Sequence, residues 1–238
     1  MPESIDKLIE RQVGRWNLER QKRLEAEKNG EKPVIRPIVT ISRQRGSRGR
    51  HLAEKLAEKL GYELLHREVI DKICESAGYR RRIIESLDDK VRSRIELWFD
   101  GVFRGPYIDS TDYFRHLYKV IMSIAEHGGV VVVGRCANFI LAHDQGFHIR
   151  VVCALPTRIG NLIRYQNFTR DQAEKEIKEF DRSRAELVRR NFRREIDDPQ
   201  AYDLVINTTS IDIENAVRLA EMGMQAKMRS LGTPPADS

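Results

Sequence analysis

Cysteine is scarce in this 238-residue chain, and its three copies, Cys74, Cys136 and Cys153, form no C-x-x-C pair. Disulfide scaffolds and zinc sites rely on closely spaced cysteines, so neither organises this protein. The scatter is typical of a chain kept in a reducing compartment. The six histidines also lack the H-x-x-x-H spacing of a helical metal site. No metal site is therefore expected from histidine or cysteine.

Long apolar runs are absent as well. No stretch approaches the roughly 20 residues of a membrane-spanning helix, and the N-terminus is polar and charged. Apolar residues make up 40% of the chain, enough for a packed core. Charged residues make up 33% and the net charge is +6, which favours an anionic partner such as a nucleotide phosphate or a nucleic acid. We expect a cytoplasmic protein without a membrane partner.

The chain divides into three predicted parts. Residues 1–36 form an amphipathic helix, from Ser4 to Lys28, and a linker; residues 37–228 form one α/β domain; residues 229–238 form a disordered tail. The apolar face of the helix would pack on the domain or on a second copy of the chain, giving a homodimer. A nucleic-acid-binding arm is disfavoured because acidic and basic residues alternate along this helix.

Strands and helices alternate from Pro37 onward. The run GVVVVG from Gly129 to Gly134 is β-branched without polar alternation, as in a central parallel strand buried on both faces. The chain also has four further predicted strands, at Ile38–Ser42, Tyr62–His66, His148–Ala154 and Asp203–Asn207. Helical crossovers between them predict a mostly parallel five-stranded sheet covered on both sides. Ligands bind such sheets at the carboxyl ends of the strands.

The loop after the first strand carries the clearest chemical signal. The stretch Ile38–Leu52, IVTISRQRGSRGRHL, runs from an apolar strand through a loop of Gly, Ser and Arg into a helix. Backbone N–H groups of such a loop and of the helix N-terminus bind phosphate. Arginine is a bidentate phosphate ligand, and the loop has four of them: Arg43, Arg45, Arg48 and Arg50. The usual G-x-x-x-x-G-K-[ST] lysine and hydroxyl are missing. The alternative is an ordinary turn with solvated arginines.

Two other arginine-bearing segments are candidates for the same edge of the sheet. Arg135 directly follows the buried strand of VVVGRCANFIL, so its side chain leaves at the ligand face unless it caps a helix or pairs with a surface carboxylate. Cys136 beside it is expected to be a packing residue. The charged helix Arg170–Arg194 is either a solvated, salt-bridged helix or a mobile lid. Its candidate lid arginines are Arg182, Arg184, Arg189 and Arg190.

These segments together resemble a known family. The sequences ISRQRGSRGRHLAEKLAEKLG, YELLHREVI, VVVGRCANFIL, DRSRAELVRRNF and DPQAYDLVINT follow one another between about Ile38 and Met228. In this order and spacing they resemble the cytidylate kinase-like family, a branch of the nucleoside-monophosphate kinases with the P-loop fold. The resemblance implies a three-layer α/β/α domain that uses ATP and Mg²⁺. It also implies transfer of the γ-phosphoryl group to a pyrimidine nucleotide, with CMP or dCMP as the expected acceptor.

The resemblance also implies roles for individual residues. Arg50, as a substitute for the missing lysine, and the lid residues Arg182 and Arg184 would be catalytic. Mg²⁺ would be held through the phosphates, with Ser47 as the candidate protein ligand. The implied ATP-phosphate site is Gly46, Ser47, Arg48, Gly49, Arg50 and His51. The implied acceptor-nucleotide site is Arg135, Arg67, Tyr107, Asp109 and Arg115.

The phosphate loop departs from the usual motif in several positions. Aligned on the following Leu-Ala, Gly49 stands at the lysine, His51 at the hydroxyl residue and Arg43 at the first glycine. Arg48 stands where this branch has glycine. The acidic residues of the cytidylate kinase D-G-R-D motif are replaced by Val133 and by a cysteine.

These departures leave two other hypotheses open. The first is a nucleotide-binding regulator, or pseudokinase, on the same fold. An Arg50 side chain that reaches the β- and γ-phosphates favours catalysis, whereas one that points to solvent favours a binding role. The second is a nucleic-acid-binding protein, which is disfavoured because no aromatic stacking residues stand among the arginines.

Overall fold

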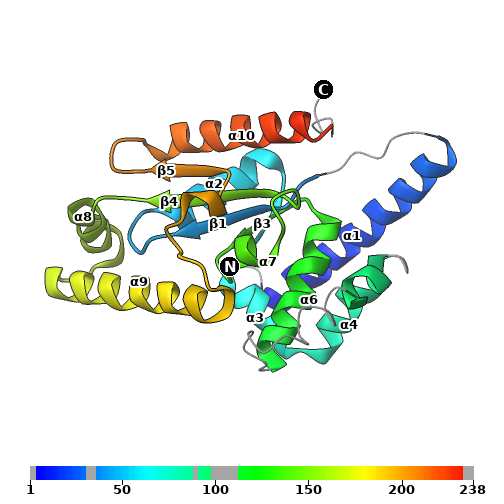
Figure 1. The fold of residues 1–238 in the computed structure, drawn as a ribbon, viewed down its shortest axis with the longest axis horizontal. Coiled ribbons are helices and arrows are strands. Elements are labelled where there is room, and N and C mark those ends of the chain that lie inside the picture. Colours follow the sequence, from blue (N-terminus) through cyan, green and yellow to red (C-terminus); the bar gives the residue numbers. More distant parts are fainter. Residues whose placement is uncertain (1–3, 31–35, 88–90, 98–111, 233–238) are drawn as a thin grey trace.

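The computed structural model describes residues 4–30, 36–87, 91–97 and 112–232, and its centre is a five-stranded parallel sheet. The strand order is β2-β3-β1-β4-β5, so the chain crosses the sheet before returning to its other edge (Figure 1). The strands are β1 (Val39–Arg43), β2 (Glu63–Leu65), β3 (Val130–Val133), β4 (Phe147–Val152) and β5 (Leu204–Asn207). The predicted fold class is confirmed, with each strand within two residues of its predicted ends.

Helices connect the strands and lie on both faces of the sheet. They are α1 (Ile5–Lys28), α2 (Gly49–Leu60), α3 (Arg67–Glu75), α4 (Ala77–Glu85), α6 (Asp112–His127), α7 (Ala137–Ile140), α8 (Leu155–Gln166), α9 (Arg170–Phe192) and α10 (Ile213–Ser230). Residues 91–97 are also helical, and Pro199–Ala201 form a 3₁₀ turn. Within the described residues, no helix is both long and apolar enough to cross a membrane.

Helix boundaries follow local capping. Helix α9 begins at Arg170 because Thr169 and Gln172 form a capping box. Helix α10 begins at Ile213 because the side chain of Asp212 accepts a hydrogen bond from the N–H of Asn215. The short helix α7 was not predicted. The predicted disordered tail, 229–238, is wrong at its start, because Arg229 and Ser230 belong to α10; residues 233–238 lie outside the described residues.

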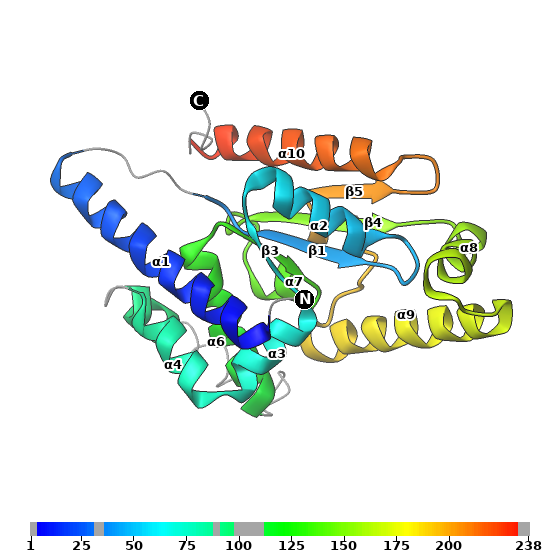
Figure 2. The same cartoon turned by 180° about the vertical axis from the view of Figure 1, so that it is seen from behind.

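The alternation of side chains along β3 builds two separate cores. Val131 and Val133 face the core that α2 and α10 cover, whereas Val130 and Val132 face the core formed with α1, α3, α4 and α6 (Figures 1 and 2). All four valines are almost completely buried. The sheet is therefore rigid on both faces, which fixes where each strand ends.

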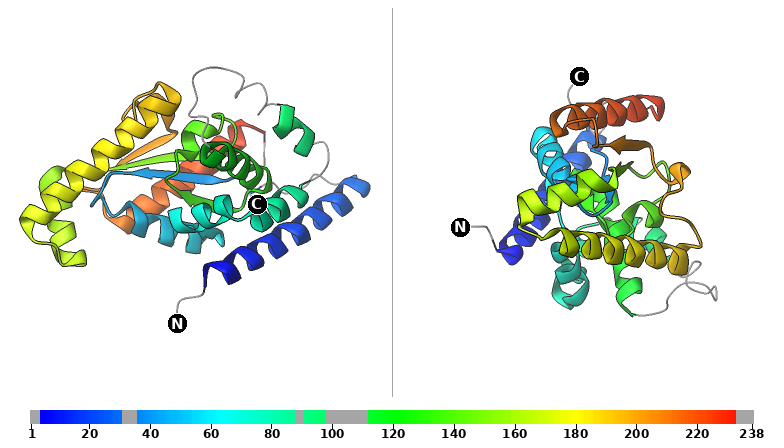
Figure 3. Two further views of the ribbon diagram at one scale, coloured as in Figure 1. Left: turned by 90° about the horizontal axis from the view of Figure 1, so that it is seen from below. Right: turned by 90° about the vertical axis from the view of Figure 1, so that its left-hand side faces the viewer.

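Helix α1 packs on the domain of its own chain. Ile9, Val13 and Trp16 are buried in the core that also contains α3, α4 and α6, and Figure 3 shows α1 alongside α3. The indole of Trp16 stacks on His127, with ring centroids 4.6 Å apart, and its Nε1–H donates to the carbonyl of Gly128 at 3.4 Å. Burial lowers the pKa of His127 to about 4, so the imidazole is neutral at neutral pH. The apolar face of α1 was expected to pack on the domain or on a second copy of the chain, and the structure shows it packed on the domain.

Helices α8 and α9 form a hairpin across the carboxyl ends of the strands, as the end-on view in Figure 3 shows. The hairpin has a small apolar core of its own, made by Ile159, Leu162, Ala173 and Ile177. This core is separate from the two cores of the sheet, but the C-terminal part of α9 packs against the core of α1, α3, α4 and α6 through Leu187 and Phe192. We refer to α8 and α9 as the lid.

Candidate functional site

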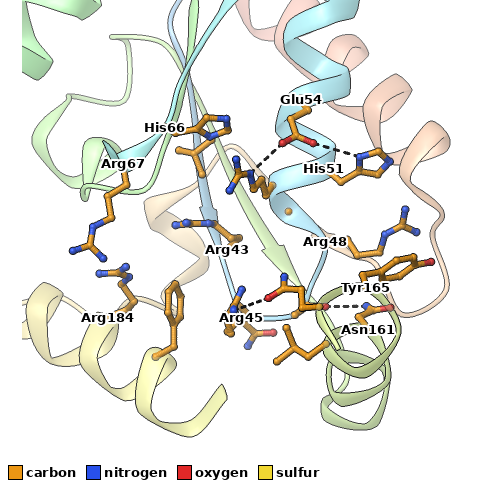
Figure 4. A pocket seen from close by; sticks show the side chains of 18 of the residues that line it. Arg43, Arg45, Arg48, His51, Glu54, His66, Arg67, Asn161, Tyr165 and Arg184 are labelled. Carbon is orange, nitrogen blue, oxygen red and sulfur yellow. Dashed lines mark hydrogen bonds and ion pairs between the residues drawn. The ribbon is translucent and has the colours of Figure 1, made fainter. Parts of the chain in front are cut away.

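A cavity of about 690 Å³ lies at the carboxyl ends of the strands, between the β1–α2 loop, the start of α3 and the lid (Figure 4). This volume is in the range of small-molecule sites. Its walls are rich in arginine; we call it the main cavity. The six cationic side chains that line it are Arg43, Arg45, Arg48, Arg50, Arg67 and Arg184.

The β1–α2 loop has the backbone of an anion site. Gly46 has φ 81°, and a Cβ there would lie 2.7 Å from the carbonyl oxygen of Arg158, so only glycine fits. Arg48, the N-cap of α2, is also left-handed (φ 60°) and makes no side-chain cap. The first turn of α2 has no acidic residue. Its N–H groups are therefore directed at the main cavity without a capping side chain, as in phosphate sites at helix N-termini.

The arginines of this loop differ in their partners. Arg45 donates from Nε to Glu176 at 2.9 Å and from Nη2 to Gln166 at 2.8 Å, so the lid neutralises it. The guanidinium of Arg48 lies over the ring of Tyr165, 5.2 Å from the centroid. The Arg50 side chain is 67% exposed and donates to Glu54 on its own helix at 3.1 Å. This exposed position of Arg50 is the one that favours a binding role over catalysis.

Arg43 is in a different situation. Its side chain lies in the wall of the main cavity, between Arg48 on one side and Arg184 on the other (Figure 4). Among the described residues, it forms no ion pair with a carboxylate. Burial, followed by the nearby charges of Arg184 and Arg45, lowers its pKa to about 10. It is still charged at neutral pH, without a counter-ion.

The hydroxyl of Ser47 is turned away from the cavity. Ser47 is fully buried, and its Oγ donates to the carbonyl of Gln44 at 2.8 Å. Its own carbonyl accepts from Oγ1 of Thr208 at 2.9 Å. Ser47 thus stabilises the loop instead of facing the cavity. The oxygen donors that do line the cavity are the carboxylates of Glu54 and Glu68. Within the described ranges no cluster of three or more His, Cys, Asp or Glu could hold a metal ion.

A second, smaller cavity of about 40 Å³ adjoins the first; we call it the side cavity. It lies against the segment after β3, including Arg135 and Cys136, and against the C-terminal half of α9. Both cavities have the same four residues in their walls: Arg43, Arg67, Val133 and Arg184. Three of these four are arginines, so the boundary between the cavities is strongly cationic.

Arg135 is held by a carboxylate of α3. Its Nη2 pairs with Asp71, and only 11% of its side chain is exposed. Asp71 also accepts from the hydroxyl of Tyr113 at 2.8 Å and lies 3.5 Å from Nε of Arg67. One carboxylate therefore orients two arginines and a tyrosine beside the side cavity. Asp71 was not predicted as a site residue, and it supplies an acid close to the place where D-G-R-D has its own.

The segment after β3 is strained. Gly134, Arg135 and Cys136 have φ values of 80°, 55° and 54°, so three consecutive residues are left-handed. Such a conformation costs on the order of 1 kcal/mol or more for each non-glycine residue. Burial raises the pKa of Cys136 to about 11, which keeps it a thiol. That protonation state agrees with the expected packing role of Cys136.

In the lid, Arg184 faces the site. Its guanidinium lies over the ring of Phe180, 4.5 Å from the centroid, and it lines both cavities. Burial and the charge of Arg67 lower its pKa. Arg182 is 70% exposed, with Glu186 at 3.9 Å, and Arg189 pairs with Glu195 at 2.7 Å outside the cavities.

Besides Glu176, a second carboxylate of the lid, Asp181, contacts the loop. Asp181 accepts from the backbone N–H of Arg45 at 3.1 Å and pairs with Nη2 of Arg158. The side chain of Arg158 is 6% exposed, and its Nε donates to the carbonyl of Arg45 at 2.8 Å. The N-terminal half of α9 is thus fixed to the phosphate-binding loop.

The remaining predicted site residues are only partly placed. Tyr107 and Asp109 lie outside the described residues. Arg115 is exposed on α6 and lines neither cavity. His51 is in the first turn of α2, and its imidazole lies 3.6 Å from Glu54. Asp71 lies at the site but was not selected from the sequence. Arg43 was one of the four loop arginines expected to bind phosphate, but it was not in the ATP-phosphate set that the family resemblance implies.

Comparisons with known proteins agree with this architecture. The model of the cytidylate kinase-like family matches residues 38–210. An uncharacterized protein from Eubacterium ventriosum ATCC 27560 has a TM-score of 0.64 at 21% identity, covering 81% of this chain and 99% of that chain. Shikimate kinase from Acinetobacter baumannii in complex with shikimate has a TM-score of 0.42 at 13% identity, covering 82% of this chain and 94% of that one. No curated protein matches the sequence.

Proposed function

The chain belongs to the cytidylate kinase-like family, and on that premise we propose that it transfers the γ-phosphoryl group of ATP to a pyrimidine nucleoside monophosphate, CMP or dCMP. The observation that carries the proposal is the shared boundary of the two cavities. Arg43, Arg67 and Arg184 line both of them. A phosphoryl group that passes from one nucleotide to another needs such a cationic boundary between its two sites. The reducing-compartment cysteine pattern supports a cytoplasmic location.

The main cavity is the proposed ATP site. Its volume suits a nucleoside triphosphate, and N–H groups of the loop Gly46–His51 are the proposed phosphate donors, except that of Ser47, which donates to the carbonyl of Gln44 at 3.3 Å. The ring of Tyr165, over which the guanidinium of Arg48 lies, is at the side of the main cavity opposite Arg184 (Figure 4). Mg²⁺ would neutralise the charge that develops on the transferring phosphates, and Glu54 and Glu68 are the cavity carboxylates that would hold it directly or through water.

The side cavity is the proposed site of the acceptor phosphate. Arg135 and Arg67, both oriented by Asp71, are its proposed ligands, and Tyr107, Asp109 and Arg115 remain candidates for the nucleoside. Only about 40 Å³ is open with the lid in its present position. Acceptor binding therefore requires the lid to shift, as in other enzymes whose lids close on substrate.

The chemistry is a displacement at phosphorus. The bond from the γ-phosphorus to the β–γ bridging oxygen breaks, and its electron pair leaves with ADP. An oxygen of the acceptor phosphate forms the new bond to phosphorus; this oxygen is already anionic, so no general base is needed. The task of the protein is alignment and charge stabilisation. Arg184 and Arg182 of the lid and Arg50 of α2 are the proposed cationic residues.

The test is an assay of ADP release with ATP and Mg²⁺ against CMP, dCMP, UMP, AMP and GMP. We expect the highest kcat/KM with CMP or dCMP, at least about tenfold above the purines, because a pocket that hydrogen-bonds one base edge rejects another. ADP release without any acceptor serves as the background. ATP binding without release above that background for every acceptor would refute the kinase proposal.

The second candidate is a nucleotide-binding regulator on the same fold. The observation in its favour is Arg50, whose side chain pairs with Glu54 and is 67% exposed. This candidate predicts ATP binding with no turnover. The acceptor assay therefore separates the two candidates directly.

Arg135→Ala is expected to weaken binding of the acceptor about 10- to 100-fold and binding of ATP less than about threefold, because a charge-assisted hydrogen bond to the acceptor phosphate is lost. Calorimetric titration with CMP and with ATP measures the two affinities. Arg81→Ala, an exposed arginine on α4, is the matched control and should change neither. Equal losses for both nucleotides would show that Arg135 is misassigned.

A further inference from the structure

Gly49 stands at the position of the motif lysine, and the structure shows what occupies the space above it. A Cβ added to Gly49 would lie 2.6 Å from Cβ of Arg43 and 3.2 Å from its Cγ. Contacts under about 3 Å between carbon atoms are strongly repulsive. The stem of Arg43 therefore fills the place where a side chain at position 49 would begin. No side chain is accommodated at position 49 while Arg43 keeps this path.

The guanidinium of Arg43 ends at the boundary of the two cavities. Its Nη1 would lie 2.8 Å from a Cβ on Gly134, so it reaches from the end of β1 to the end of β3. It lines both cavities, and Arg184 approaches the same boundary from the lid. Phe180 supplies an aromatic ring 5.7 Å from its Cζ. The charge thus lies at the boundary of the two cavities, beside the loop that the proposed function assigns to the ATP phosphates.

Arg43 is one of the cavity arginines without an ion pair among the described residues. Arg45 pairs with Glu176 and Arg50 with Glu54, but no carboxylate of the described residues lies within ion-pair distance of Arg43, and burial lowers its pKa. Keeping a half-buried guanidinium charged without a paired anion is unfavourable. A site that holds such a charge ready is suited to an anionic ligand, which repays that cost on binding.

We infer that Arg43, and not Arg50, replaces the motif lysine by passing over Gly49 and contacting the β- and γ-phosphates of the donor nucleotide. This inference rests on the proposed function for the identity of the donor. The loop departs from the usual motif by an arginine at the first-glycine position and a glycine at the lysine position. On this inference the two departures compensate each other, because the glycine leaves room for the arginine side chain. The positive charge enters from the end of β1 instead of from the start of α2. Arg50 is left free for its surface pair with Glu54.

Arg43→Met tests the charge while keeping the stem over Gly49. We expect the affinity for ATP to fall about 100-fold and the affinity for AMP to change less than about threefold, because AMP has no β- or γ-phosphate. The ligand-free variant should unfold at the same temperature as the wild type or higher, since an unpaired buried charge is removed. Arg81→Ala, on α4 outside both cavities, is the matched control and should change the ATP affinity less than about threefold, and Arg50→Ala should weaken ATP binding less than Arg43→Met does. Unchanged ATP binding by Arg43→Met, or an equal loss in Arg50→Ala, would overturn the inference.

An exchange of the two positions gives a second, independent test. Gly49→Lys alone should bind ATP at least about 30-fold more weakly, because the new side chain meets Arg43. Arg43→Gly alone should lose as much, because the charge is gone. The double variant, with glycine and lysine at positions 43 and 49 as in the usual motif, should bind ATP more tightly than either single variant. If the double variant bound ATP no more tightly than the weaker-binding single variant, the side chains at positions 43 and 49 would not compete for the same space.

These binding results are independent of turnover. A wild-type protein that binds ATP but phosphorylates no acceptor would therefore refute the proposed function alone.

Discussion

Replacing Arg184 with alanine is expected to lower kcat for phosphoryl transfer about 1000-fold while changing the affinity for ATP less than about fivefold. Arg184 lines both cavities, and its guanidinium is held over Phe180. It is partly buried, and burial lowers its pKa, so its charge acts in a medium of low polarity where it stabilises an anion more strongly. In the transition state, negative charge spreads over the oxygens of the transferring phosphoryl group, and the guanidinium of Arg184 is expected to stabilise this charge. Initial rates at saturating ATP and CMP measure the loss.

Two further variants separate this role from the general charge of the lid. Lys175→Ala removes a cation of α9 that is 77% exposed and lies outside both cavities, and it should change kcat less than about twofold. Arg184→Lys keeps the charge without the planar fork and should recover part of the rate. A loss below tenfold in Arg184→Ala, or a comparable loss in Lys175→Ala, would rule out the transition-state role.

Trp16→Ala is expected to lower the free energy of unfolding by about 3 to 5 kcal/mol, the range for truncating a buried aromatic side chain. Trp16 is 1% exposed; it stacks on His127 and donates to Gly128. Its loss opens a cavity between α1 and the end of α6 and leaves the neutral imidazole of His127 without its stacking partner. Urea denaturation followed by far-ultraviolet circular dichroism measures the change.

The control for this prediction lies on the same helix. Leu18 is 52% exposed, so Leu18→Ala should change the stability by less than about 0.5 kcal/mol. Because α1 packs on its own domain, the denaturation midpoint of the wild type should not depend on protein concentration. Equal effects of both substitutions, or a midpoint that rises with concentration, would mean that the apolar face of α1 is used between two chains.

Much of the fold follows from local sequence patterns. The β-branched run at 130–133, the capping residues of α9 and the glycine after α2 act within a few residues, so they can be recognised without tertiary contacts. Helix α7 could not be predicted in this way. It begins after left-handed Arg135 and Cys136, and non-glycine residues rarely adopt that conformation without tertiary constraint.

The candidate site was less predictable because the same residue type appears in different environments. The pair Arg50–Glu54 has helical i,i+4 spacing and could be expected from sequence. The partner of Arg45, Glu176, is 131 residues away, so only the folded chain shows that Arg45 is neutralised. For Arg43, the sequence shows an arginine at the first-glycine position and a glycine at the lysine position. Only the structure shows that the side chain of Arg43 passes over Gly49.

The carboxylate of Asp181 makes the lid and the loop thermodynamically linked. It contacts an amide and a guanidinium that belong to two elements more than 100 residues apart from each other in sequence. A ligand that draws the Arg45 amide toward a phosphate weakens that link and so shifts the equilibrium of lid positions. By reciprocity, any change that shifts the lid alters nucleotide affinity by the same factor. On the proposed function, nucleotide binding and lid position are therefore coupled through Asp181.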